Sequence, residues 1–461
     1  MNRRFILVLD WPTRFEDEAS TRVTISEMFP LLERAPGSVS FLTSDPISLI
    51  VRLNEICVPE PTAEATGQRI VNTPPAPAAT RTVADRAGFI LNQLPQGGLF
   101  ADMDWRISPA PFALGADLSR EIETLGRVLL QFNRAVNLLY RQSVAGKQPS
   151  WVAAWLDRGK PAKLIELQRS DALKNEWPRV IRPDLLITDH GLALTELDSV
   201  PGGIGLTAWL NQTYARLGEA VLGGAEGMPR GFAGIFGEAH AVHVVVSREA
   251  ATYRPEMEWI CHRLNSVERS FLPRDETPFP FSDGDAVYRF FELFDLANVP
   301  VADALFDAAV QKRIRLTPPP KPIFEEKMLF ALLWNRNLRE FWRRELGEGF
   351  LKRLFKLVPY TWVVDPTPLP PQAVIPELNL TDWQQLKALS QKERELIVKA
   401  SGFSEHAWGA RSVYLGSDLS HVDWGAAVDA ALAGFERSPC VLQRYHKPKV
   451  VESSYYDFAG G

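Results

Sequence analysis

An acidic hairpin near the middle of the chain constrains this sequence more than any other feature. It occupies residues 181–203, IRPDLLITDHGLALTELDSVPGG. The pattern predicts a short strand that ends at Asp184, a turn at residues 189–191 and a second strand at Leu192–Leu197. A Pro-Gly-Gly corner follows the second strand and ends it, because both residue types interrupt regular strands.

The hairpin gathers three carboxylates. Alternate residues of a strand face the same side of a sheet, so Glu196 and Asp198 point together and Leu197 faces the other side. Asp184, on the neighbouring strand, can join them. Three carboxylates at one place suit Mg²⁺, which takes oxygen ligands and usually holds substrate phosphates as well. Spacing alone favours the alternative, an ordinary hairpin whose outer face is acidic and solvated.

Size and composition indicate a cytoplasmic protein of two or three domains. The 461 residues are too many for one hydrophobic core. The 46% apolar and 23% charged residues are typical of soluble globular proteins, and a net charge of −5 argues against nucleic-acid binding and leaves small-molecule partners. Cys57, Cys261 and Cys440 match no metal or redox spacing. The apolar start is too short for a signal peptide, and no later stretch predicts a membrane span.

The first half of the chain predicts a mixture of strands and helices. Arg4–Leu9 is a predicted strand, and residues 58–84, rich in Pro, Ala and Thr, predict a long loop or mobile insertion. Apolar residues at helical spacing predict a long amphipathic helix from Ala116 to about Val144. After the hairpin, a helix is expected at Leu206–Leu217.

The following segment predicts an open α/β unit with parallel strands. Its expected order is a glycine-rich linker at Gly223–Gly237, a strand at Ala241–Val246 and a helix at Arg254–Leu264. His240 and His243 fall on opposite faces of that strand, which predicts one solvated and one packed histidine. Further helices are predicted at Phe324–Trp334 and Arg339–Lys356, between proline-rich breaks at 317–322 and 365–376.

A second group of residues predicts an anion site. Lys399 follows an apolar strand in ELIVKASG, and a lysine at the end of a buried strand is costly unless an anion meets it. A phosphate is a natural partner, and the loop Gly402–Gly409 can close over it with backbone N–H groups. The strand Cys440–Tyr445 can border an adenine ring. The alternative is a lysine that merely extends to the surface.

Together these segments resemble ATP-grasp enzymes. IVKASG and FEEKMLFALL are similar to the two segments that hold the ATP phosphates, which implies Lys399 and Lys327, with Lys321 in reserve. KLVPYTWVV, residues 356–364, resembles the turn into the small domain, and VLQRYH resembles the hinge. The resemblance implies adenine contacts from Gln443, Arg444 and Tyr445. KVVESSYYD resembles the next strand and implies that Glu452 lies towards the ribose.

The hairpin resembles the metal-binding segment of D-alanine–D-alanine ligase and its relatives. This resemblance implies that Asp184, Glu196 and Asp198 are Mg²⁺ ligands and that Arg182 meets a phosphate or the acyl-phosphate oxygens. The segment precedes both lysines, an order similar to that of the circularly permuted ATP-grasp group, which includes eukaryotic-type glutathione synthetase and resembles glutathionylspermidine synthase. GDAVYRFFELFD, residues 284–295, also resembles a segment of that group.

The resemblance implies an α/β fold with four parts and a ligase activity. An N-terminal part spans 1–115, the metal-binding part 116–205, a pre-ATP-grasp α/β domain 206–320 and the ATP-lysine and hinge part 321–461. The implied reaction is ATP- and Mg²⁺-dependent joining of a carboxylate and an amine through an acyl phosphate. The alternative is an ATP-grasp fold that binds a nucleotide or a protein partner without turnover.

The sequence departs from the family pattern in three places. The loop after Lys399 is FSEHAW where the family often has a glycine run. Asp198 stands where asparagine is usual, although it still offers an oxygen. The chain stops soon after the hinge, so either the closing strands come from the segment before Arg182 or they are missing. We therefore expect Val450–Tyr456 to lie on an open sheet edge or to be poorly ordered.

Overall fold

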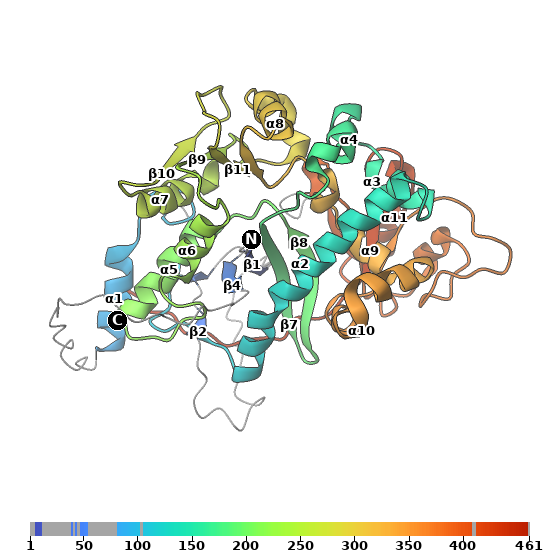
Figure 1. Cartoon of the computed structure of the whole chain (residues 1–461). Coiled ribbons are helices and arrows are strands. Elements are labelled where there is room, and N and C mark those ends of the chain that lie inside the picture. Colours follow the sequence, from blue (N-terminus) through green and yellow to red (C-terminus); the bar gives the residue numbers. More distant parts are fainter. Residues whose placement is uncertain are drawn as a thin grey trace.

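The computed structural model describes residues 5–11, 38–39, 42–43, 47–53, 81–101, 105–407 and 412–459, the first four stretches as backbone strands only. The fold is mixed α/β, in agreement with the sequence (Figure 1). Residues 58–80 of the predicted loop lie outside the described residues. Val83, near its expected end, begins the helix α1 (Val83–Gln93).

The predicted hairpin forms two strands of a four-stranded sheet. In order, its strands are β4 (Ile47–Leu53), β1 (Phe5–Trp11), β7 (Val180–Thr188) and β8 (Gly191–Asp198). The predicted N-terminal strand is present as β1, which runs parallel to β7. The expected end of β7 at Asp184 is wrong, because a register shift after Asp184 lets the apolar residues that follow continue the ladder to Thr188.

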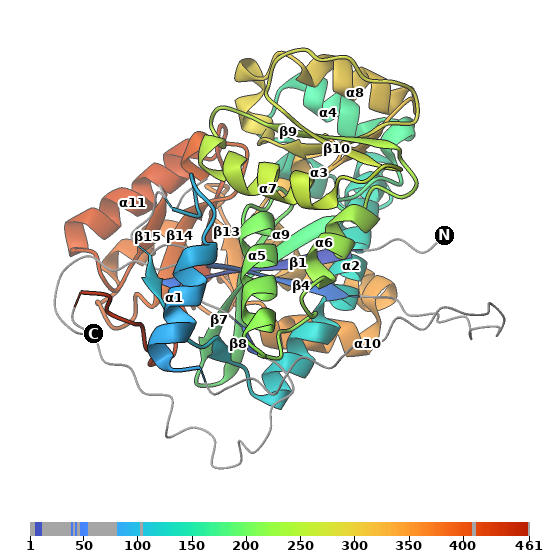
Figure 2. The ribbon, with the colours of Figure 1, turned by 90° about the vertical axis from the view of Figure 1, so that its left-hand side faces the viewer.

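The predicted parallel unit forms a second sheet. In order, its strands are β10 (Ser270–Arg274), β9 (Ala241–Val246), β11 (Ala286–Phe290) and β12 (Arg315–Thr317). All neighbours are parallel. Helix α7 (Arg254–Leu264) lies on one face and α8 (Ala302–Val310) on the other (Figure 2). His240 is exposed and His243 is buried, as the spacing predicts.

Two helices stand beside this sheet, one of them unexpected. Helix α5 (Ile204–Arg216) confirms the helix predicted after the hairpin. The linker predicted at Gly223–Gly237 is wrong in part, because it contains α6 (Gly227–Gly234). Met228 and Phe232 of α6 are buried in the core of the second sheet. The burial of these two apolar side chains stabilises a helix here despite the glycines in the segment.

A third sheet is antiparallel and carries Lys399. In order, its strands are β13 (Thr361–Val363), β16 (Cys440–Arg444), β14 (Leu396–Ala400) and β15 (Val413–Leu415). Helix α11 (His421–Gly434) packs on one face through Trp424 and Val428. The helix predicted at Phe324–Trp334 begins later, as α9 (Met328–Trp334), because the backbone N–H of Lys327 donates to Ser401 at 2.7 Å instead.

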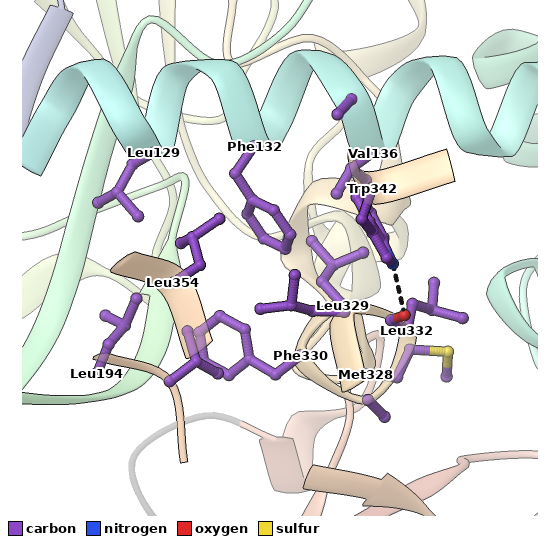
Figure 3. Close-up of a cluster of buried hydrophobic side chains, with 14 of the residues drawn as sticks. Leu129, Phe132, Val136, Leu194, Met328, Leu329, Phe330, Leu332, Trp342 and Leu354 are labelled. Atoms are coloured by element: carbon purple, nitrogen blue, oxygen red, sulfur yellow. Dashed lines mark hydrogen bonds between the residues drawn. The ribbon is translucent and has the colours of Figure 1, made fainter. Parts of the chain in front are cut away.

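The long helix α2 (Ala116–Val144) packs in one core cluster that also contains residues of the hairpin strands and of the third sheet. The helix has the predicted bounds and buries its apolar face against α9, β8 and α10 (Arg339–Leu357). Figure 3 shows Phe132 and Val136 of α2 pointing towards Trp342 and Leu329. The indole N–H of Trp342 donates to Leu332 at 2.8 Å, which fixes the ring in this cluster.

Removing an aromatic ring from this cluster should destabilise the whole protein. We expect Phe132→Ala to lower the free energy of unfolding by about 3–5 kcal/mol, because a fully buried ring leaves a cavity. Arg127→Ala on the exposed face of the same helix is the control and should change it by less than about 0.5 kcal/mol. Urea denaturation of both variants measures the difference, and equal midpoints would contradict this account of the core.

The remaining elements are short. They are α3 (Ser150–Asp157), α4 (Ala162–Arg169) and the strand pairs β2 (Ser38–Val39) with β6 (Phe112–Ala113) and β3 (Leu42–Thr43) with β5 (Arg106–Ile107). In the parts of the chain described here, no helix combines the length and apolar character needed to cross a membrane.

The C-terminal tail forms no strand, so the strand predicted at residues 449–457 is wrong. Single contacts hold the tail instead. The backbone N–H of Lys449 donates to Ile187 at 2.7 Å, and that of Tyr456 donates to Ile107 at 2.9 Å. The tail therefore runs from the end of β7 to β5, and the half-exposed Tyr455 ring lies against Arg106, 4.7 Å from its guanidinium carbon.

Candidate functional site

The hairpin places four charged residues of two strands opposite one another. In the ladder of β7 and β8, Asp184 is the partner of Glu196, and Arg182 is the partner of Asp198. Alternate positions on both strands share one face, so all four side chains project from the same side of the sheet. The charge pattern predicted from the spacing is therefore present on one surface.

Arg182 lies between two of the carboxylates. Its Nε is 3.1 Å from Asp184 Oδ1, and one of its terminal nitrogens is 3.2 Å from Asp198 Oδ2. Asp198 also accepts a hydrogen bond from the backbone N–H of Val200 at 2.7 Å, at the corner after β8. The guanidinium thus ties the two strands together and places one positive charge between these two carboxylates.

Lys327 neutralises the third carboxylate. Its Nζ lies 2.7 Å from Glu196 Oε1 and also donates to the backbone carbonyl of Ala407 at 3.1 Å. Burial opposes the charge, but the attraction of Glu196, and then of Asp184 and Asp198, raises the pKa of Lys327. Burial alone would raise the pKa of Glu196, yet the nearby cations, Lys327 first, lower it. Both groups are therefore charged at neutral pH.

Lys399 reaches the same cluster from the third sheet, and its partners are neutral. Its Nζ donates to Gln443 Oε1 at 3.1 Å and to the backbone carbonyl of Thr195 at 3.4 Å. Burial, partly offset by Glu196, lowers the pKa of Lys399 to about 8. Among the described residues, no carboxylate is at ion-pair distance from this buried ammonium group, and such a group is suited to receive an anion.

A buried network holds the two lysines relative to each other. The Lys160 ammonium group, between α3 and α4, lies 2.5 Å from Glu326 Oε1, and the hydroxyl of Ser401 donates to the other oxygen of Glu326. The Ser401 hydroxyl also accepts from the backbone N–H of Met328 at 2.9 Å. Because Ser401 directly follows β14, the network fixes the end of the Lys399 strand beside the backbone of Lys327.

The residue after Ser401 must be small. A Cβ atom added to Gly402 would lie 2.2 Å from the carbonyl oxygen of Glu325, which is closer than van der Waals contact allows. The Gly402–Gly409 loop therefore needs this glycine for close packing beside the site. Residues 408–411 of that loop lie outside the described residues.

A second carboxylate pair, Glu292 and Glu325, lies beside the cluster and is not predicted by residue spacing. Arg289 is fully buried and lies 2.5 Å from Glu325 Oε1, whose other oxygen accepts the backbone N–H of Leu293 at 3.2 Å. Burial, Glu325 and Asp198, in that order, raise the pKa of Glu292 well above its ordinary value. The protonated form of Glu292 is therefore favoured in this buried place.

A sequence signal for this pair exists in the segment GDAVYRFFELFD. Arg289 and Glu292 are the charged residues within its apolar run, and a charge inside such a run requires a buried partner. The partner, Glu325, comes from a distant segment, so the sequence alone does not pair them.

The structure brings together most of the predicted site residues but leaves some apart. Gln443 lies in the cluster, whereas the neighbouring Arg444 side chain is exposed and Tyr445 is half-buried. Glu452 is exposed on the C-terminal tail. The reserve candidate Lys321 is buried elsewhere, where its Nζ donates to Asn137 Oδ1 at 2.7 Å, and burial lowers its pKa to about 7.

The carboxylates as arranged do not form a metal cage. Within the described residues, no group of three or more His, Cys, Asp or Glu side chains is placed to hold a metal ion. The donor chemistry explains this, because Arg182 and Lys327 already contact Asp184, Asp198 and Glu196. The prediction that these three residues bind Mg²⁺ stays a prediction.

A further carboxylate shapes the corner after the hairpin. Glu256 of α7 is fully buried, and its two oxygens accept the backbone N–H groups of Gly203 at 2.6 Å and Leu206 at 2.8 Å. It therefore caps the N-terminus of α5 directly after the Pro-Gly-Gly corner. Burial raises the pKa of Glu256 to about 7, although these backbone hydrogen bonds oppose the rise.

This buried carboxylate predicts a pH dependence of stability. Between pH 4.5 and 7 the folded chain holds a proton on Glu256 that the unfolded chain releases, so its contribution to stability falls as the pH rises through this window. The change is on the order of 3 kcal/mol. Urea denaturation at pH 4.5, 6 and 7.5 should show a steeper fall for wild type than for Glu256→Gln. Parallel curves would contradict the assignment.

Comparison with known proteins does not assign this chain to a family, so the function of the site must be inferred from its own residues. Neither a protein-family model nor a curated protein matches the chain.

Proposed function

We propose that this protein is an ATP-dependent carboxylate–amine ligase of the circularly permuted ATP-grasp type. One observation carries the proposal: Lys327 and Lys399, from two later segments, meet the carboxylate face of the hairpin. Lys327 lies 2.7 Å from Glu196, and Lys399 lies 3.4 Å from the carbonyl of Thr195. A mixed α/β architecture with a separate parallel sheet is compatible with this assignment.

The charges of the cluster suit phosphoryl transfer. Lys327, Lys399 and Arg182 can neutralise the phosphates of ATP while a substrate carboxylate attacks the γ-phosphorus and displaces ADP. The acyl phosphate formed is then attacked by an amine, which yields an amide and phosphate and releases one proton. The protein contributes positioning and charge neutralisation.

The proposal includes Mg²⁺, although the three carboxylates as arranged contact Arg182 and Lys327. Asp184, Glu196 and Asp198 are its proposed ligands, and when bound it would neutralise phosphate charge.

A second candidate is an ATP-grasp fold that binds a nucleotide or a protein partner without turnover. The observation in its favour is the occupation of the three carboxylates by Arg182 and Lys327. Release of ADP and phosphate in the presence of an acid and an amine separates the two candidates.

The test is a screen of acid and amine pairs for ADP release. Amino acids and short peptides supply the acids, and amino acids and polyamines supply the amines. We expect ADP to appear only when both substrates are present, and only in the protein with Lys399 intact. A protein that binds ATP but releases no ADP with any pair would favour the second candidate. Absence of ATP binding would contradict the ligase and the nucleotide-binding form of the second candidate, and would leave only the binding of a protein partner.

A further inference from the structure

A line of buried hydrogen bonds crosses the third sheet from Pro359 to Lys399. The hydroxyl of Thr361 donates to the backbone carbonyl of Pro359 at 2.8 Å. The side-chain amide of Gln443 donates from Nε2 to Thr361 Oγ1 at 3.1 Å, and its Oε1 accepts from Lys399 Nζ at 3.1 Å. Thr361 and Gln443 are each 2% exposed and Lys399 is 8% exposed, so a hydrogen bond lost here would leave a buried group without a partner.

The strand register explains why these three side chains meet. Thr361 of β13 is directly opposite Gln443 of β16, and Lys399 of β14 is opposite Val441, two residues before Gln443. Alternate residues of a strand face the same side, so Thr361, Gln443 and Lys399 share one face of the sheet. Helix α11 covers the opposite face.

The hydrogen-bonding capacity of each group fixes the orientation of the Gln443 amide. The Thr361 hydroxyl has one hydrogen, which it donates to Pro359, so towards Gln443 it can only accept. The Lys399 ammonium group can only donate. The NH₂ end of the amide must therefore face Thr361, and its carbonyl must face Lys399. In the reversed orientation two donors would meet at Lys399, and Gln443 Oε1 would compete with Pro359 for one hydrogen.

This arrangement holds the ammonium group of Lys399 without cancelling its charge. A carboxylate at position 443 could also accept from Lys399, but it would form a buried ion pair that an arriving phosphate would have to separate. The amide oxygen is neutral, so the positive charge stays available to an anion.

We propose that Thr361 is a positioning residue for Lys399 and acts through Gln443. Without the Thr361 hydroxyl, the NH₂ group of Gln443 loses its acceptor, and the side chain can turn away from Lys399. The ammonium group then loses its hydrogen bond to Gln443, so a phosphate that binds it must restrict it further. The inference rests on the proposed function, in which Lys399 binds ATP phosphates, and it adds a residue that acts on the nucleotide through Lys399.

The first test compares two variants of Thr361 by calorimetry with a non-hydrolysable ATP analogue. Thr361→Val keeps the shape but lacks the hydroxyl, and it should weaken binding about three- to tenfold, the loss typical for one neutral hydrogen bond. Thr361→Ser keeps the hydroxyl and should bind within about twofold of wild type. Wild-type affinity in folded Thr361→Val would overturn the proposal, and so would a serine variant as weak as the valine variant.

The matched control is Thr188→Val. Thr188 is also a buried threonine, and its hydroxyl donates to the backbone carbonyl of Gly191 at 2.8 Å, but it lies at the turn of the hairpin. The variant loses the same chemical group as Thr361→Val and should bind the analogue as tightly as wild type. A loss as large as that of Thr361→Val would overturn the proposal, because any buried hydroxyl would then have the same effect.

A double-mutant cycle with Lys399→Met separates positioning from a general structural role. In the Lys399→Met background, Thr361→Val should change the affinity by less than about twofold, because the group that it positions is absent. Thr361→Ala, which also lacks the hydroxyl, replaces Thr361→Val if that variant does not fold. The same loss in both backgrounds would refute this inference alone. Failure of the wild-type protein to bind the analogue would refute the proposed function and this inference with it.

Discussion

Replacing Lys399 with methionine should weaken ATP binding by about 10- to 100-fold, the loss typical for one hydrogen bond to a charged group. Methionine keeps most of the buried stem and removes the charge, so the β14 strand and its backbone pairing with β16 should remain. The affinity is measured by calorimetry with a non-hydrolysable ATP analogue. Circular dichroism of the variant checks that the fold is intact.

The matched control for this prediction is Lys387→Met. Lys387 lies in the same part of the chain as Lys399, but its Nζ forms an exposed ion pair with Asp429 at 2.9 Å. We expect its ATP affinity to equal that of wild type. If Lys399→Met also binds ATP as tightly as wild type, the phosphate role of Lys399 is wrong, and the central observation behind the proposed function loses its meaning.

ATP affinity should also fall steeply above pH 8. Lys399 has a pKa of about 8 in the free protein, and bound phosphates would raise it by stabilising the ammonium form. Above pH 8 binding must therefore take up a proton, and the affinity should fall about tenfold for each pH unit until the pKa of the bound state is reached. Lys327 should not contribute, because its pKa is already raised by Glu196.

Two measurements check this pH dependence. The analogue is titrated at pH 7, 8 and 9, and the titrations at pH 9 are repeated in buffers of different ionisation enthalpy to count protons taken up. Wild type should take up close to one proton at pH 9, whereas Lys399→Met should take up fewer and show a flatter affinity profile. Identical profiles would mean that another group titrates.

The sequence predicts those features that depend on local periodicity. Helix α2 has the expected bounds of Ala116 and Val144 because its apolar stripe repeats at helical spacing over its whole length. The hairpin is also correct, since alternation and the turn at residues 189–191 specify it locally. Two predictions are wrong for local reasons. The first strand of the hairpin continues beyond Asp184 after a register shift, and the predicted glycine-rich linker contains α6, whose apolar side chains are buried.

The rest of the site depends on contacts between distant segments. Spacing places Glu196 and Asp198 on one face, but it cannot show that Lys327 arrives there as their counter-ion. Spacing likewise cannot show that Glu292 lies beside Glu325 or that Glu256 caps α5. Each joins residues whose proximity is decided by the packing of whole sheets, and no short pattern in the chain records it.

The long helix α2 has a consequence for how the chain is made. Its Gln131 side chain donates to the carbonyl of Glu345, which lies 214 residues later. On a ribosome that adds about 5–20 residues per second, α2 waits roughly 10–40 seconds for α9 and α10. During that time its apolar stripe lacks much of its cover. Nascent chains halted before Met328 should be cleaved quickly by added protease, whereas chains halted well beyond Leu357 should resist. Until α9 and α10 have been made, dilution or a chaperone must keep the uncovered apolar stripe of α2 from associating with other chains.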